Sequence, residues 1–168
     1  KIKKVNKQEK QEKNEKASDM MIGKWIKCDN CKQILYKEEV HNNFSVCPNC
    51  GKHFRISSRR RIKQIADEGT FEEIGAEVET QDPLNFDGYL KKIETLREKT
   101  KINEAVKCGT CEINGEKAVL AVMDSNFMMG SMGSCVGERI TLAIEKSIEL
   151  KLPLVIFCVS GGARMQEG

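Results

Sequence analysis

Two glycine-rich turns near the end of the chain carry the pattern best suited to chemistry. The first lies within Asn126–Gly137 (NFMMGSMGSCVG), and the second contains Gly161, Gly162 and Ala163 between a serine and an arginine. Glycine permits positive φ and lets backbone amides approach a ligand with no Cβ in the way. Two converging amides form an oxyanion hole, in which one donor is worth about 2.7–4 kcal/mol of barrier. The turns therefore predict a site that stabilises negative charge, and tight turns without a ligand are the alternative.

Four cysteines nearer the start of the chain form a second chemical pattern. Cys28 and Cys31 (CDNC) and Cys47 and Cys50 (CPNC) are two CxxC pairs with fifteen residues between them, a spacing typical of zinc sites. Each pair makes a tight turn that aims two thiolates at one point, and two such turns complete a tetrahedral site. We expect one structural zinc that stabilises folding of the module. A redox dithiol is the alternative.

A third CxxC, formed by Cys108 and Cys111, is expected to bind no metal. Ala105–Ile113 and Lys117–Asp124 flank an Asn-Gly pair, which is a strong signal for a two-residue hairpin. Residues three apart on a regular strand point to opposite faces. The two thiols therefore diverge.

A strand–helix–strand unit is predicted to position the two glycine turns. Ala118–Asp124 (AVLAVMD) and Leu154–Val159 (LVIFCV) are apolar runs of strand length. Between them an amphipathic helix begins at Ser134 and ends at the Lys151–Pro153 boundary. A crossover helix implies that the two strands are parallel. Both turns then lie at carboxyl ends of strands, where ligands bind in open α/β sheets.

The remaining segments give local predictions. Ser57 is the expected N-cap of a helix that ends at Gly69, and Asp87 is the expected cap of a second helix that runs to Thr100. Phe71–Glu79 is predicted as a strand. Residues 1–22 are expected to be a disordered basic tail, because their first eighteen residues carry almost nothing apolar.

Composition sets wide bounds on function and location. The net charge of +3 neither demands nor excludes an anionic partner. The apolar runs are far shorter than the roughly 20 residues of a membrane helix, and no signal-peptide pattern is present, so we expect no membrane partner. Eight cysteines without an export signal indicate metal ligands and core thiols, and a cytoplasmic location.

The segments Phe127–Glu138 (FMMGSMGSCVGE) and Ser160–Gly168 (SGGARMQEG) resemble the two signature segments of the β subunit of bacterial acetyl-coenzyme A carboxylase carboxyltransferase. The resemblance extends back to about Trp25, and Cys135 replaces an aliphatic residue that is usual in the family. It implies a four-cysteine zinc ribbon over residues 23–56. A crotonase-like α/β domain follows over residues 57–168 and is expected to be incomplete at its C-terminus.

The resemblance also implies an activity. The family transfers a carboxyl group from carboxybiotin, held on its carrier protein, to acetyl-coenzyme A, giving malonyl-coenzyme A in the first committed step of fatty acid biosynthesis. Implied partners are the carboxyltransferase α subunit in an α2β2 heterotetramer, the biotin carboxyl carrier protein and biotin carboxylase. Because the apolar Leu154–Val159 strand has nothing after it to cover its other face, we expect these residues alone to be inactive.

Candidate site residues follow from the turns and the resemblance. The amides of Gly161, Gly162 and Ala163 are suited to stabilise an enolate next to the thioester. The residues expected to shape the thioester pocket are Gly130, Ser131, Met132, Gly133 and Ser134. The residues expected to bind the phosphates of coenzyme A are Arg139 and Arg164.

The alternative from another class is a zinc-ribbon nucleic-acid-binding protein. Arg59–Arg61 forms a basic patch with Lys52, His53 and Arg55 beside the four-cysteine module, as in many nucleic-acid-binding domains. Residues 118–168 argue against it as the main function, because a binding module does not require them. Nucleic-acid binding through the ribbon is kept as a secondary hypothesis.

Overall fold

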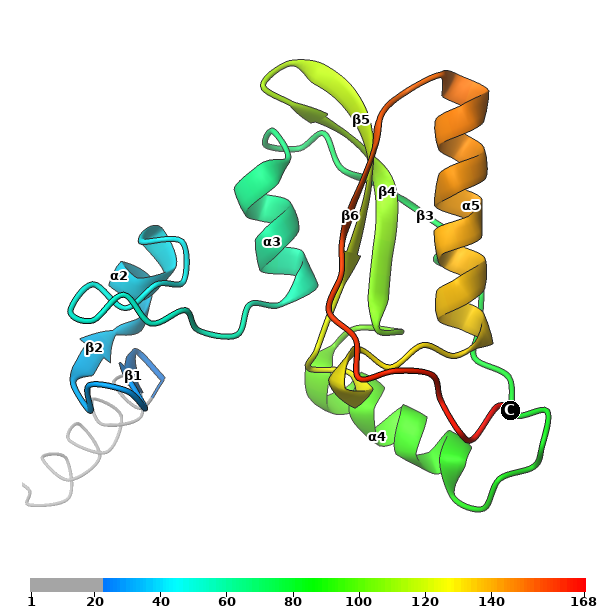
Figure 1. Ribbon diagram of the computed structural model, residues 1–168, viewed down its shortest axis with the longest axis horizontal. Coiled ribbons are helices and arrows are strands. Elements are labelled where there is room, and N and C mark those ends of the chain that lie inside the picture. The colour runs from blue at the N-terminus through cyan, green and yellow to red at the C-terminus, as the bar shows by residue number, and fades with distance from the viewer. Residues whose placement is uncertain (1–22) are drawn as a thin grey trace, which may run out of the picture. The chain divides into compact units, whose positions relative to one another are not determined.

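The computed structural model describes residues 23–168, so the predicted tail over residues 1–22 lies outside the described part. The chain divides into two compact units (Figure 1), of which the first ends at Arg55 and the second spans Ile56–Gly168.

The first unit is a small module with little apolar core. Strands β1 (Trp25–Lys27) and β2 (Ile34–Tyr36) pair antiparallel, and the rings of Trp25 and Tyr36 meet edge to face at 5.5 Å. Helix α2 (Lys37–Asn42) follows and buries Val40. The other fully buried apolar residues here are two cysteines, so hydrophobic burial alone supplies little of this unit's stability.

The second unit is built on a four-stranded mixed sheet. Its strands are β3 (Glu72–Ile74), β4 (Val106–Ile113), β5 (Glu116–Met123) and β6 (Leu154–Phe157), in that spatial order. The β4–β5 hairpin turns at Asn114-Gly115 as the sequence predicts. The last pair, β5 and β6, is parallel, which confirms the expected crossover.

Helix α5 (Ser134–Leu150) makes that crossover. A short 3-10 turn, η1 (Met128–Gly130), leads into it from the end of β5, so both the predicted helix and the turn before it are present. Val136 and Ala143 are fully buried against the sheet, which explains why the apolar stripe of this sequence folds as a helix.

The two faces of the sheet carry separate apolar clusters. Figure 1 shows α3 (Ser58–Ile65) and α5 on opposite sides, with α4 (Tyr89–Thr100) on the α5 side at one end of the strands. Cys108 packs in the cluster that contains α4 and α5 residues, whereas Cys111 packs with Ile62 of α3. The expected divergence of the two thiols is therefore confirmed.

A buried carboxylate ties α3 to the end of β5. Asp124 accepts hydrogen bonds from the Ser58 amide at 2.6 Å and from the Ser58 hydroxyl at 2.9 Å, and its own amide donates to the Ala105 carbonyl. A carboxylate is favourable at the first turn of a helix because the free amides there carry partial positive charge. The start of the first glycine turn is thus anchored to α3 through the Asp124 side chain and to the residue before β4 through its backbone.

Three predicted boundaries are wrong. Helix α3 is capped by Ser57 as expected but ends at Ile65, because the chain then turns so that the Asp67 amide can bind the Glu112 carbonyl of the hairpin. Helix α4 is preceded by Gly88 in a left-handed conformation, not capped by Asp87.

The third concerns β3, which is shorter than the predicted strand because the backbone turns at Gly75. Within residues 23–168, no helix combines the length and apolar character that crossing a membrane requires.

Because Cys108 and Cys111 are buried on opposite faces of the sheet, we expect replacing them to change stability without changing metal content. Replacing both with serine should leave zinc stoichiometry unchanged, while each hydroxyl that is buried without a partner costs about 1–3 kcal/mol. Metal analysis and denaturant unfolding of the double variant measure both effects. Loss of a zinc equivalent would contradict the placement.

Candidate functional site

Four thiols converge in the first unit. The Sγ atoms of Cys28 and Cys50 lie 3.7 Å apart, as do those of Cys31 and Cys47, and all four lie within 4.8 Å of one another. A tetrahedral zinc with bonds of about 2.3 Å places its sulfur ligands about 3.8 Å apart. The donor set and its spacing therefore fit zinc, and these four cysteines are the predicted ligands.

The surroundings of these thiols affect their ionisation unequally. Burial raises the pKa of Cys47 to about 11, whereas a hydrogen bond from the Asn30 side chain lowers the pKa of Cys50 to about 6. A hydrogen bond from the Asn49 side chain lowers the pKa of Cys31. Four adjacent thiolates repel one another, so a divalent cation is the counter-charge that lets all four ionise together.

Removing one zinc ligand should abolish the site. In Cys47→Ser we expect loss of the zinc and unfolding of residues 25–55, because structural zinc supplies most of the folding free energy of such modules. Cys158→Ser is the matched control, since Cys158 is exposed and lies on the other unit. Metal analysis and hydrogen exchange report the outcome, and full zinc retention in Cys47→Ser would refute the assignment.

The two glycine turns of the second unit lie side by side. Met132 and Ala163 form an isolated parallel bridge, in which the Met132 amide donates to the Gly162 carbonyl at 2.8 Å and the Arg164 amide donates to the Met132 carbonyl at 2.9 Å. This bridge follows the paired ends of β5 and β6. The structure therefore brings together the two glycine-rich turns that were predicted from the sequence to form a site.

Only glycine fits at position 130, because the backbone of the second turn approaches it closely. A Cβ at Gly130 would lie 2.1 Å from the Val159 carbonyl oxygen, and its φ is +72°. Met128 and Met129 have φ values of 43° and 55°, so three consecutive residues are left-handed. Such strain is uncommon outside glycine and concentrates at functional sites.

Two of the three predicted amide donors are free. The Gly162 amide donates to the hydroxyl of Ser160, two residues earlier, at 3.0 Å. Within residues 23–168 the amides of Gly161 and Ala163 have no acceptor, and both residues are exposed. In a parallel bridge, the carbonyl before and the amide after the bridged residue make the bonds, so the Ala163 amide points away from Met132.

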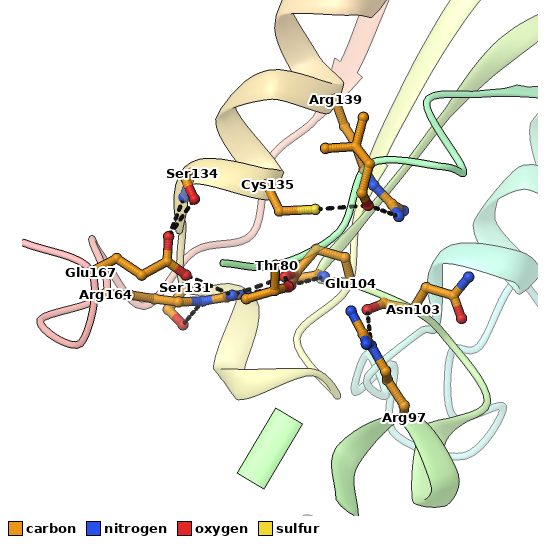
Figure 2. A network of polar contacts seen from close by, with 12 residues as sticks. Thr80, Arg97, Asn103, Glu104, Ser131, Ser134, Cys135, Arg139, Arg164 and Glu167 are labelled. Carbon is orange, nitrogen blue, oxygen red and sulfur yellow. Dashed lines mark hydrogen bonds and ion pairs between the residues drawn. The ribbon is translucent and has the colours of Figure 1, made fainter. Parts of the chain in front are cut away.

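A buried ion pair lies beneath the turns, and the sequence analysis missed it. The Arg164 side chain is fully buried and makes two hydrogen bonds to the Glu104 carboxylate, one of them 2.9 Å from Nη1 to Oε2. Nε also donates to Ser131 Oγ of the first turn at 3.3 Å (Figure 2). Although burial opposes its charge, the bonds to Glu104 raise the pKa of Arg164 above its ordinary value.

Further contacts complete this network. Glu104 accepts from the Thr80 hydroxyl and the Ala105 amide, both at 2.6 Å, and Arg164 also donates to the Tyr89 hydroxyl at 3.1 Å. Burial raises the pKa of Tyr89 to about 12. The carboxylate and the guanidinium are thus both compensated, as a buried charge requires.

Glu167 links the end of the second turn to the start of α5. The amide and hydroxyl of Ser134 donate to Glu167 Oε2 at 2.5 and 2.7 Å (Figure 2). The Tyr89 hydroxyl donates to Glu167 Oε1. Burial opposes ionisation of this carboxyl, but the hydrogen bonds from Tyr89 and Ser134 lower its pKa below the usual value.

The predicted phosphate-binding role of Arg139 and Arg164 needs correction. Arg139 is also buried and donates to the carbonyls of Ala76 and Val78 at 3.3 and 2.8 Å, where the Cys135 thiol joins it. Neither guanidinium is exposed to meet a phosphate, so both have structural roles here. The one sequence signal for the buried pair is a glutamate, Glu104, next to an apolar strand.

Fold and site together define a zinc-ribbon α/β protein with two adjoining glycine turns. The acetyl-CoA carboxylase zinc finger domain matches residues 25–50, and the carboxyl transferase domain matches residues 52–168. The chain therefore belongs to the carboxyl transferase family, which confirms the resemblance in the sequence and does not support the nucleic-acid-binding alternative.

Individual relatives agree. The chain is 53% identical over 153 residues to acetyl-coenzyme A carboxylase carboxyl transferase subunit beta of Carboxydothermus hydrogenoformans, covering 91% of this chain and 55% of that protein. It is 58% identical over 144 residues to the subunits beta/alpha protein of Clostridium tetani, covering 86% of this chain and 25% of that one. The chain spans about half the length of the beta-subunit relatives it matches.

A solved structure of transcarboxylase 12S shares the fold. It has a TM-score of 0.58 at 22% identity, covering 99% of this chain and 28% of that one. The predicted zinc ribbon followed by an α/β domain is therefore confirmed.

The contact at Gly130 yields a stability prediction. Gly130→Ala should lose about 1–3 kcal/mol of unfolding free energy from its left-handed φ. Overlap with the Val159 carbonyl should cost about 1–3 kcal/mol more. Gly69→Ala is the matched control, because Gly69 has φ +79° with nothing within 4 Å of its added Cβ. Denaturant unfolding compares the two, and equal losses would contradict the tight approach of the turns.

Proposed function

We propose that this chain acts within the β subunit of a carboxyltransferase that moves a carboxyl group onto acetyl-coenzyme A, giving malonyl-coenzyme A. The observation that carries the proposal is that the amides of Gly161 and Ala163 have no acceptor within residues 23–168 and lie on a glycine turn bridged to a second one. Support comes from relatives whose names state this activity.

The two amides suit the charge that the reaction creates. Removing a proton from the methyl group of an acyl thioester places negative charge on the carbonyl oxygen. Amides of Gly161 and Ala163 would donate to that oxygen, and fixed donors stabilise such charge without reorganisation. Gly130, Ser131, Met132, Gly133 and Ser134 would shape the thioester pocket beside them. Bound carboxybiotin would supply the activated carboxyl group.

Partners and surroundings follow from the same proposal. The Clostridium tetani relative is named as subunits beta/alpha, which supports an α subunit as the direct partner, in an α2β2 assembly. A biotin carboxyl carrier protein and biotin carboxylase would complete the pathway to the product, in the cytoplasm. The domain would have the crotonase-like architecture, and the zinc would serve the folding of the ribbon.

The test uses the β subunit extended to the length of its relatives and assembled with the α subunit. Gly162→Val should reduce malonyl-coenzyme A formation by about 10²-fold or more, because a residue unsuited to φ +102° rotates the amides on either side of it. Gly69→Val has comparable φ strain and open space but lies away from the turns.

Three results would count against the proposal. Wild-type turnover in Gly162→Val would remove the oxyanion assignment, and an inactive wild-type assembly would remove the activity. Residues 1–168 alone are expected to form no malonyl-coenzyme A, so product from them would refute a site shared with the α subunit.

A further inference from the structure

The segment after the second glycine turn folds back under the first. Arg164 bonds through its backbone amide to Met132 and through its side chain to Ser131, and Glu167 then reaches Ser134. Residues 164–167 therefore contact three residues between the first turn and the start of α5: Ser131, Met132 and Ser134. Figure 2 shows Arg164 between Ser131 and Glu104, with Glu167 beside the start of α5.

The Glu167 carboxylate caps the start of α5 through hydrogen bonds. It accepts hydrogen bonds from both the amide and the hydroxyl of Ser134, the first residue of α5. Helix α5 leaves this amide without an intrahelical partner, and negative charge is favourable there. A Cβ at Gly133 would lie 2.3 Å from Glu167 Oε1, so the carboxylate is also pressed against the turn itself.

This contact joins the segment that follows the second glycine turn to the start of α5. The Gly161 and Ala163 amides lie on the same short segment as Glu167, while Met132 and Gly133 belong to the opposite turn. Among residues 23–168, the other hydrogen bonds between the two segments are the two backbone bonds at Met132 and the bond from Arg164 Nε to Ser131 Oγ. A shift of about 1 Å in such a site can change the rate by about 10²-fold.

We propose that Glu167 is a positioning residue for carboxyl transfer: by holding the first turn of α5, it fixes the Gly161 and Ala163 amides relative to the thioester pocket. The inference rests on the proposed function. Glu167 acts through the turns and touches no reacting atom.

Two glutamates near the start of α5 allow a matched comparison. Glu138 is exposed on the second turn of the same helix and, unlike that of Glu167, its side chain makes no hydrogen bond or ion pair with any residue of 23–168. Glu167→Gln and Glu138→Gln each remove one negative charge from the same end of the helix. Only the first also weakens the link between the turns.

The experiment measures steady-state carboxyl transfer in the assembled, full-length complex. For Glu167→Gln we expect kcat to fall about tenfold with KM for acetyl-coenzyme A changed less than about twofold, because the amides act in the transition state. Glu167→Ala should lose more, and Glu138→Gln should leave both constants within about twofold. If the Glu167 variants do not assemble, Tyr89→Phe removes one donor to Glu167 and should lower kcat in the same way.

Activity-independent data separate this inference from the proposed function. Amide exchange at Met132 and Arg164, which bridge the turns, should accelerate in Glu167→Gln and stay unchanged in Glu138→Gln. This holds even if the wild-type complex makes no malonyl-coenzyme A. Unchanged exchange, wild-type kcat in an assembled Glu167 variant, or equal loss in Glu138→Gln would overturn the proposal.

Discussion

The buried ion pair between Arg164 and Glu104 is the interaction on which the site depends. Both side chains are fully buried, and losing one partner of such a pair typically costs about 3–5 kcal/mol because the other charge remains uncompensated. The guanidinium also binds Ser131, and the Arg164 amide binds Met132. A charge that must be satisfied in the interior thus forces two glycine turns, distant in sequence, to lie together.

The two units reach stability by different means, and this explains their different composition. In the first, four thiols within 4.8 Å of one another replace a core that so few apolar residues cannot form. In the second, the strands β4 and β5 are buried on both faces, between α3 on one side and α4 and α5 on the other. The rigid sheet places the turns at its parallel edge, where backbone amides are free to meet a ligand.

Much of this could be predicted from the sequence, because the signals are local. The CxxC pairs, the Asn-Gly hairpin and the apolar periodicity of α5 each fix a small part of the structure through spacing alone. The partners of Arg164 could not be predicted, since Glu104 lies sixty residues earlier in the chain and only the folded sheet brings them together. For the same reason Arg139 and Arg164 looked like exposed phosphate ligands, and the role of Glu167 at α5 gave no sequence signal.

The central claim is that the free amides of Gly161 and Ala163 meet the thioester oxygen. A crystal structure of the full-length β subunit with its α subunit and an acyl-coenzyme A analogue measures this directly. We expect both amide nitrogens within about 2.7–3.1 Å of the thioester carbonyl oxygen or its enolate equivalent. A thioester bound away from both amides, or an oxygen held by side chains alone, would contradict it.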